Sequence, residues 1–274
     1  MTPILVFDIE TVPDVEGVRR LHGVPAQMAD RDVLAWYGNF RRAASGGDFA
    51  PLYLHRVVAI GCVLRDGATL TVWSLGDVND SEPELIRRFF DGIERYTPQL
   101  VSWNGGAFDL PVLQYRAMVH GVSAARYWDW GDDDRDFRFN NYLARFHTRH
   151  LDLMDVLANF QPRAYAGLDA MARLAGFPGK LGMDGGAVAA SVAAGRLADV
   201  RNYCECDVMN TYLLYVRFRL MRGEIDAAEY AREVALVRER ITALDAPHWH
   251  NFLNAWERAD GRSDCGKVGI RPAA

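Results

Sequence analysis

The stretch VFDIET (6–11) overlaps the apolar run 4–7, which predicts a short buried strand. Side chains two apart on a strand point to the same side, so Asp8 and Glu10 are expected to lie together. Two carboxylates roughly 4 Å apart repel each other by about 4 kcal/mol at an effective dielectric of about 20, and a bound cation removes that cost. Carboxylate oxygens suit Mg²⁺ or Mn²⁺, so the stretch predicts a divalent metal site.

After this first strand, the sequence predicts further strands and then helices. Residues 56–64 and 68–75 predict two strands joined by the hairpin turn signal Asp66-Gly67. Apolar spacing then predicts a strand at 99–103 and helices at 82–96, 110–120, 151–160, 167–175, 186–195 and 197–222. This order predicts an α/β protein with a mixed sheet and a helical second half.

The segment WNGGAFD (103–109) ends in a third acidic residue. Its Asn-Gly-Gly turn follows a predicted strand, and Asp109 is expected where that turn enters a helix. The glycine pair could form only a tight turn, or could also let the backbone approach a ligand closely. Phe108 has two interpretations, a position in the core or a role in stacking against a terminal base.

The segment YCECD (203–207) supplies a fourth acidic residue within a predicted helix. Tyr203 and Asp207 are four residues apart and therefore share one helix face, with about 5–6 Å between their Cβ atoms. If the four carboxylates meet, two ions about 3.5–4 Å apart could activate a water and stabilise the leaving oxygen of a phosphodiester.

These motifs, in this order, resemble those of the DEDD superfamily of 3′–5′ exonucleases. FDIET is similar to the first motif, Asn104, Phe108 and Asp109 to the second, and Tyr203 with Asp207 to the third. The tyrosine subtype matches better, because the histidine subtype would need His at the position of Asn202. Over roughly residues 3–221, the chain more closely resembles the stand-alone predicted exonucleases related to the proofreading domain of B-family DNA polymerases, in FDIETVPD, NGGAFDLPVL, HLDLMDVL and YCECDVMNTYLLY.

The resemblance implies a ribonuclease H-like domain over residues 1–222 and a C-terminal helical extension over 223–274. It implies hydrolysis at the 3′ end of DNA, with single strands favoured, releasing nucleoside 5′-monophosphates with two Mg²⁺ or Mn²⁺ ions. The expected metal ligands are Asp8, Glu10, Asp109 and Asp207, with Asp8 bridging both ions and Tyr203 orienting the water. The expected substrate contacts are Thr11, Asn104, Phe108 and Lys180.

Two alternative functions stay open. An RNA-trimming 3′–5′ exoribonuclease would differ in 2′-hydroxyl contacts, whose geometry a sequence does not give. A non-catalytic nucleic-acid-binding module would usually lack one acid, and all four are present. Because residues 223–274 are too few for a polymerase domain, any proofreading is expected in trans, with a polymerase or repair partner.

Three further features have two interpretations each. The segment FRFNNYLARFHTRH (137–150) interleaves cations with rings, which is typical of a single-strand surface or of a solvated basic helix. Asp152 and Asp155 could bind metal, although capping of a helix is favoured. Lys180 precedes Leu181 rather than Ser or Thr, so the phosphate-loop pattern and ATP binding are not supported, and a single phosphate contact is the alternative to a structural role.

The composition excludes several classes of protein. With 274 residues and 50% hydrophobic content the chain can bury a large core, while its formal charge of −5 argues against a protein that coats nucleic acid electrostatically. No stretch approaches the roughly 20 apolar residues of a membrane span, and the N-terminus lacks a signal-peptide pattern. The cysteines have no zinc spacing, so reduced thiols in a cytoplasmic protein are expected at Cys62, Cys204, Cys206 and Cys265.

Overall fold

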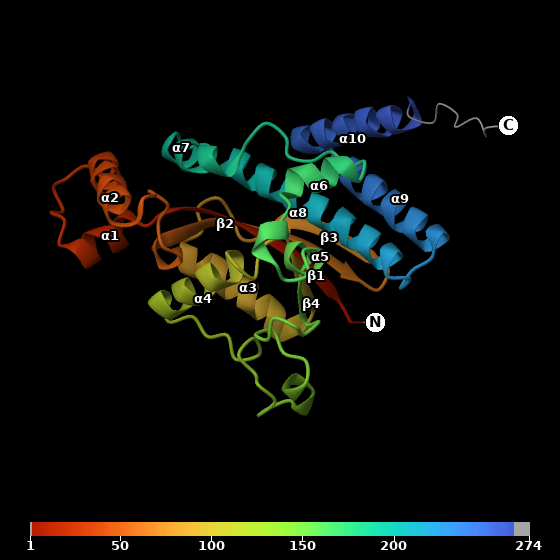
Figure 1. The fold of residues 1–274 in the computed structure, drawn as a ribbon, viewed down its shortest axis with the longest axis horizontal. Helices are drawn as coiled ribbons and strands as arrows, with labels where there is room; N and C mark the ends of the chain where they lie inside the picture. Colours follow the sequence, from red (N-terminus) through yellow and green to blue (C-terminus); the bar gives the residue numbers. More distant parts are fainter. Residues whose placement is uncertain (1, 266–274) are drawn as a thin grey trace.

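A computed structural model of the chain describes residues 2–265, and its centre is a five-stranded sheet in the order β3-β2-β1-β4-β5 (Figure 1). The strands are β1 (Ile4–Pro13), β2 (His55–Asp66), β3 (Thr69–Ser74), β4 (Gln99–Ser102) and β5 (His150–Asp152). β2 is antiparallel to β1 and β3, whereas β4 is parallel to both β1 and β5. The predicted α/β class, with a mixed sheet flanked by helices and a helical C-terminal part, is confirmed, in keeping with the ribonuclease H-like fold that the resemblance implied.

Helices cover both faces of this sheet. One face packs against α3 (Glu82–Tyr96) and α4 (Asp109–His120), and the other against the long helix α8 (Leu197–Met221) (Figure 1). The remaining helices are α1 (Val15–His22), α2 (Asp30–Ser45), α5 (Leu153–Leu157), α6 (Leu168–Leu174), α7 (Val188–Ala193), α9 (Ala227–Ala243) and α10 (Pro247–Cys265). Short 3₁₀ helices lie at Leu52–Leu54, Arg135–Arg138, Pro162–Ala164 and Gly185–Ala187.

The alternation of side chains along β1 decides where its acidic residues point. Leu5, Phe7 and Ile9 join the core with α3 and α4, whereas Ile4 and Val6 join the core with α8. With a period of two, Asp8 and Glu10 belong to the α8 side of the sheet. The third motif lies on α8, so strand and helix periodicities together bring the first and third motifs to one place.

A glycine on the neighbouring strand allows α8 to approach closely. Gly61 pairs with Asp8 in the β1–β2 register, and a Cβ atom on Gly61 would lie 2.9 Å from both the carbonyl oxygen and the Sγ of Cys204. The backbone N–H of Gly61 donates to that Sγ at 3.2 Å. Any larger residue at position 61 would therefore push the third motif away from Asp8.

The C-terminal helices share the core of the sheet. Trp249, Phe252 and Trp256 of α10 are buried in the same cluster as the apolar residues of α8. Glu233 of α9 pairs with Arg65 of β2 at 2.6 Å and accepts a hydrogen bond from Tyr212 of α8 at 2.8 Å. The division at residue 222 remains a prediction, and residues 266–274 of the proposed extension lie outside the described part.

Several predicted boundaries were wrong. The first strand extends to Pro13 rather than ending at Phe7, and residues 151–160 begin with β5 before the short helix α5. Only 188–193 of the helix predicted at 186–195 is α-helical. The segment 137–150 is not a basic helix, because after its 3₁₀ start it consists of turns until β5. Helices α1 and α2, which Figure 1 shows projecting beside the sheet, were not predicted.

No helix within residues 2–265 combines the length and the apolar character that a bilayer-spanning segment needs.

Candidate active site

The carboxylates of Asp8 and Glu10 lie side by side next to a cysteine of α8. The ligand atoms of Asp8, Glu10 and Cys204 all lie within 4.8 Å of one another. Cys204 Sγ is 3.6 Å from the Oδ2 of Asp8 and 3.4 Å from its backbone oxygen. The sequence did not indicate this neighbour, although its position directly after Tyr203 places it on the same helix. Cys62, Cys204 and Cys206 are buried and unpaired, and the side chain of Cys265 lies outside the described residues.

Asp109 is the first residue of α4 and is 4% exposed. Its Oδ1 accepts a hydrogen bond of 3.0 Å from the backbone N–H of Ile9, the residue between Asp8 and Glu10. The predicted passage from strand through turn into helix is thus confirmed. The hydrogen bond fixes the second motif directly against the first.

Asp152 holds the turn that precedes Asp109. Its two carboxylate oxygens accept the backbone N–H groups of Asn104 and Gly106, each at 2.9 Å. The same carboxylate caps α5 by accepting from the N–H groups of Met154 and Asp155. The capping interpretation is confirmed, and the bonds to the turn make Asp152 a positioning residue that the sequence did not identify.

The turn itself needs a glycine in its second position. A Cβ atom on Gly105 would lie 2.4 Å from the Ser102 hydroxyl oxygen, and Asn104 adopts a φ of 71°. The tight-turn interpretation is therefore confirmed. The backbone carbonyl of Asn104 accepts the N–H of Phe108, so the turn leads that ring into place as well.

Lys180 connects the two residues of the third motif. Its Nζ lies 2.7 Å from the Oδ2 of Asp207 and donates a hydrogen bond of 2.5 Å to the hydroxyl of Tyr203. Asp207 and Tyr203 are 2% and 4% exposed. The other oxygen of Asp207, Oδ1, is buried without a hydrogen-bond partner among the described residues. A buried carboxylate oxygen without a partner is costly and suits a ligand such as a cation.

Burial raises the pKa of all four carboxyl groups, and neighbouring acids of the site add to this effect for Asp8 and Glu10. Burial, reinforced by the Asp207 carboxylate, raises the pKa of Glu10 to about 8, and burial raises the pKa of Asp109 to about 7. Burial and the neighbouring acids, Asp109 first, also raise the pKa of Asp8, and burial raises that of Asp207. Burial alone would lower the pKa of Lys180, but the Asp207 carboxylate outweighs this effect. Three buried carboxylates and the half-buried Asp8, whose negative charge is disfavoured, fit divalent cations.

The melting temperature in excess chelator is expected to fall between about pH 5 and about pH 8. The pKa of Glu10 is 4.5 ordinarily and about 8 in the fold, so between these values the folded state binds more protons than the unfolded state. This contribution to stability is complete at low pH and is lost as pH rises through the folded pKa. Thermal melts of the parent and of Glu10→Gln, which should show a shallower slope, test this; a parent that gains stability over this range would contradict it.

Thr11 and Phe108 line a cavity of about 640 Å³ together with Glu10. The Thr11 hydroxyl is 2.9 Å from Nδ1 of His55, whose Nε2 is 3.1 Å from the carbonyl oxygen of Ala50. Because a carbonyl only accepts, Nε2 carries the proton, and the network assigns Nδ1 as the acceptor of the Thr11 hydroxyl proton. The Thr11 oxygen then keeps its lone pairs for a donor on a ligand.

Aromatic side chains form the wall of this cavity beside Phe108. Its ring centroid is 5.2 Å from that of His55 and 6.3 Å from that of Phe49, which is exposed. The sequence did not single out Phe49, which precedes β2, or His55, which begins it, because both meet the motifs only in the fold. The motif residues that the fold gathers around the carboxylates are Thr11, Phe108, Lys180 and Tyr203; Asn104 contributes to the turn through its backbone.

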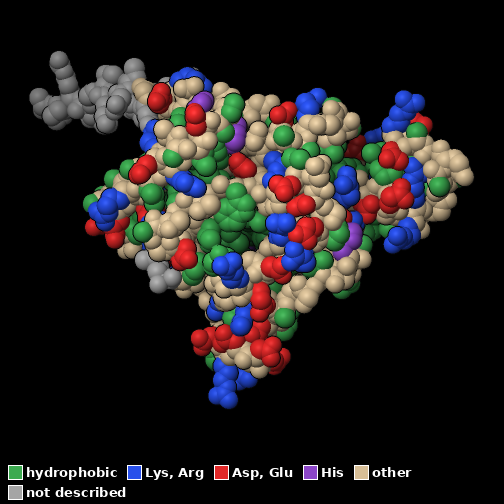
Figure 2. All heavy atoms as spheres, turned by 180° about the vertical axis from the view of Figure 1, so that it is seen from behind, with side chains coloured by type: hydrophobic (Ala, Val, Ile, Leu, Met, Phe, Trp, Pro, Cys, Tyr) green, Lys and Arg blue, Asp and Glu red, His purple; other side chains and the backbone are tan. Residues whose placement is uncertain are grey.

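The face of the molecule seen in Figure 2 carries both signs of charge. Figure 2 shows acidic and basic side chains intermingled, with acidic side chains prominent on the lower projection. That projection is the segment between α4 and β5, which includes Asp132, Asp133, Asp134 and Asp136. Long-range attraction alone does not account for binding of a phosphate backbone to such a surface, so local contacts must contribute.

Comparisons with known proteins agree with the motifs. The family described as predicted 3′–5′ exonucleases related to the exonuclease domain of PolB matches residues 47–256. The catalytic chain of DNA polymerase epsilon from Dictyostelium discoideum is 29% identical over 140 residues, which are 50% of this chain and 6% of that protein. The family B DNA polymerase of the hyperthermophilic archaeon Pyrobaculum calidifontis matches with a TM-score of 0.47 and 20% identity, over 81% of this chain and 25% of that chain.

The family match covers well over half of the chain. It contains Asp109, Tyr203 and Asp207, while Asp8 and Glu10 precede it. The structure joins the two parts, because the Asp109 carboxylate is bonded to the strand that carries Asp8 and Glu10. The chain therefore belongs to the family of predicted 3′–5′ exonucleases related to the exonuclease domain of PolB.

Proposed function

We propose that this protein is a metal-dependent 3′–5′ exonuclease that removes nucleoside 5′-monophosphates from the 3′ end of DNA, with single strands favoured. The observation that supports this most directly is the group of three buried carboxylates, Glu10, Asp109 and Asp207, beside the half-buried Asp8, in which Asp207 Oδ1 has no partner among the described residues. Bound cations would stabilise carboxylates arranged in this way. That the substrate is a phosphodiester is inferred from the family to which the chain belongs. A polymerase or repair partner in trans and a cytoplasmic location belong to the same proposal.

Two Mg²⁺ or Mn²⁺ ions held by Asp8, Glu10, Asp109 and Asp207 would supply Lewis acidity for the attacking water and for the leaving 3′-oxygen. In the proposed arrangement, Asp8, Glu10 and Asp207 would hold the ion that activates the attacking water. Asp109 would hold the ion that stabilises the leaving oxygen. Asp8 would be shared by both ions, which is supported by the effect of both the Asp109 and the Asp207 carboxylates on its pKa.

The neighbouring side chains would position the substrate and the water. Tyr203 would orient the water through its hydroxyl; the pKa of this phenol is raised by burial and by Asp207, so it stays protonated. The ammonium group of Lys180 contacts both Tyr203 and Asp207. In this position it would bind the scissile phosphate. Thr11, Asn104 and Phe108 would contact the terminal nucleotide, with the Thr11 oxygen accepting from a sugar hydroxyl.

The test is digestion of matched single-stranded DNA, duplex DNA and RNA, each labelled at the 5′ end. We expect a descending ladder from single-stranded DNA with Mg²⁺ or Mn²⁺, no products in excess chelator, and much slower turnover with Ca²⁺, whose looser geometry positions water poorly. Faster digestion of RNA would support the exoribonuclease alternative. Binding without turnover would support the non-catalytic module, and undiminished turnover after metal removal would contradict the two-metal proposal.

Tyr203→Phe is expected to lower the rate about 10- to 1000-fold, because it removes only the hydroxyl that orients the water. Metal affinity should barely change, since Tyr203 is not a proposed ligand. Rates and Mn²⁺ titrations of the parent and the variant between about pH 6 and about pH 9 measure both quantities. A variant with the rate of the parent at every pH would make Tyr203 a packing residue of α8.

A further inference from the structure

A second cavity, of about 420 Å³, opens on the other side of the N-terminus of α4. Gly106 and Ala107 line it, whereas the next residue, Phe108, lines the cavity beside Glu10 and Thr11. The turn that leads into Asp109 therefore separates the two cavities. A nucleic-acid strand with its terminal nucleotide in the first cavity would reach the second cavity by passing this turn.

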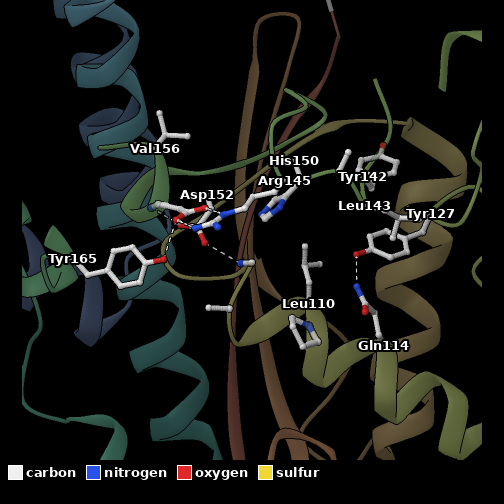
Figure 3. A pocket seen from close by; sticks show the side chains of 15 residues that line it. Leu110, Gln114, Tyr127, Tyr142, Leu143, Arg145, His150, Asp152, Val156 and Tyr165 are labelled. Atoms are coloured by element: carbon white, nitrogen blue, oxygen red, sulfur yellow. Dashed lines mark hydrogen bonds and ion pairs between the residues drawn. The ribbon is translucent and has the colours of Figure 1, made fainter. Parts of the chain in front are cut away.

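Aromatic and aliphatic side chains form part of the walls of the second cavity. Figure 3 shows Tyr165 on one side, Tyr127 and Tyr142 on the other, and Leu110 between them. The rings of Tyr127 and Tyr142 are stacked at 5.6 Å with an interplanar angle of 13°. The Tyr165 hydroxyl donates to Asp155 at 2.9 Å, so its ring is also held in place. Fixed walls of this kind suit a planar ring.

The charged groups of the cavity disfavour an isolated phosphate. Arg145 donates to both oxygens of Asp155, at 2.6 and 2.7 Å, and Asp152 adds a second carboxylate. Burial lowers the pKa of His150 to about 4, so its imidazole is neutral at pH 7. One guanidinium thus faces two carboxylates. The resulting excess of negative charge disfavours binding of an anion but not binding of a neutral heterocycle.

We propose that this cavity, the upstream pocket lined by Leu110, Tyr142, Arg145, Val156 and Tyr165, takes one unpaired nucleobase on the 5′ side of the scissile bond. The inference rests on the proposed exonuclease function and adds a substrate contact away from the reacting atoms. A base in a duplex stays stacked and paired, so such a pocket favours single strands.

The upstream pocket also gives part of the segment 137–150 a role. Tyr142 and Arg145 line it, and the neighbouring Phe146 is 73% exposed and packs edge-on against Phe160 at 4.8 Å. Arg145 in turn donates to the Phe160 carbonyl. Of the two interpretations of this segment, the single-strand surface is therefore the one that we propose, restricted to these residues.

The experiment measures binding, using fluorescent single strands of about ten nucleotides with one abasic residue at successive positions from the 3′ end. Fluorescence anisotropy is recorded in Ca²⁺, which should occupy the carboxylates without comparable turnover. An abasic residue at one position from the second to the fourth should weaken binding to the parent about 10-fold, the range of one lost base–aromatic contact. Ala144→Phe, which fills the pocket, should weaken binding of the intact strand by a similar factor.

The losses of affinity caused by the abasic residue and by Ala144→Phe should not add. On the strand that is abasic at the sensitive position, Ala144→Phe should cost no more than about twofold, because the base it excludes is already missing. Ala228→Phe, on an exposed position of α9, is the matched control and should bind like the parent. Tyr165→Ala, which removes a wall, replaces Ala144→Phe if that variant melts early.

Additive losses, sensitivity confined to the terminal position, or equal binding by parent and pocket variants would overturn the inference, as would a parent that binds no strand. A separate outcome would contradict the proposed function alone. If the parent shows the predicted binding pattern but releases no nucleotide with Mg²⁺ or Mn²⁺, the inference about the pocket stands and the proposed exonuclease activity is wrong.

Discussion

Asp8→Asn is expected to lower the rate of phosphodiester hydrolysis by about three orders of magnitude or more, because the shared ligand of both proposed ions is lost. Electrostatic stabilisation by a metal is worth several kcal/mol, and each 1.4 kcal/mol or so corresponds to a factor of ten in rate. Rates at saturating Mn²⁺ and Mg²⁺ measure the loss. A variant that keeps more than about a tenth of the parent rate would show that Asp8 is not a ligand.

The same substitution should raise the melting temperature of the metal-free protein. Burial and three neighbouring acids disfavour the charged form of Asp8, and a neutral amide of the same shape removes that cost. Asp207→Asn should not show the same gain, since it also removes the partner of Lys180. Asp133→Asn, on an exposed loop, is the matched control and should change neither rate nor melting temperature.

The pairing of residues within each motif could be predicted, because a local periodicity determines it. Residues two apart on β1 share a face, as Asp8 and Glu10 do, and residues four apart on α8 share a face, as Tyr203 and Asp207 do. The meeting of the two motifs was expected only from the family resemblance. The turn before Asp109 was indicated by its Asn-Gly-Gly sequence. The fold class followed from the order of strand and helix patterns along the chain.

The partners of those residues could not be predicted in the same way. His55 reaches Thr11 from 44 residues away, Asp152 reaches the turn from 46 and 48 residues away, and Cys204 reaches Asp8 from 196 residues away. Such contacts depend on strand pairing and on the close approach of α8 at Gly61. A single sequence records neither.

Missed boundaries also have physical causes. β1 was predicted too short because Asp8 and Glu10 interrupt its apolar run, although both lie within the strand. β5 has only three residues, too few to show a period. Helices α1 and α2 bury only Val18, Val33 and Tyr37, so they lack a continuous apolar stripe to indicate them.

Arg116→Met is expected to lower the free energy of unfolding by about 3–5 kcal/mol, the usual result of removing one partner from a buried ion pair. The Arg116 side chain is 5% exposed; it donates to both oxygens of Glu82, at 2.9 and 2.5 Å, and to Asp14 at 2.5 Å. Glu82 also accepts the backbone N–H of Val57. Without the guanidinium, two buried carboxylates would lose their cation.

This network bears on the active site because Arg116 lies on α4, the helix that begins at Asp109. Asp14 directly follows β1, and Val57 lies on β2, so the network fixes α4 against the strand that carries Asp8 and Glu10. Chemical denaturation should therefore show the loss of stability, and Mn²⁺ titration should show weaker metal binding. Arg87→Met removes an exposed arginine on α3 as the matched control and should change little.

A second variant separates the ion pair from the packing. Replacing Arg116 by Met together with Glu82 by Leu removes the guanidinium and the carboxylate that accepts two of its hydrogen bonds. The double variant should recover part of the lost stability because fewer buried charges remain unpaired. Metal affinity should recover with it if α4 returns to its place. A loss below about 1 kcal/mol in Arg116→Met would mean that water reaches these carboxylates, and that the apolar contacts of α4 suffice to hold Asp109 against Ile9.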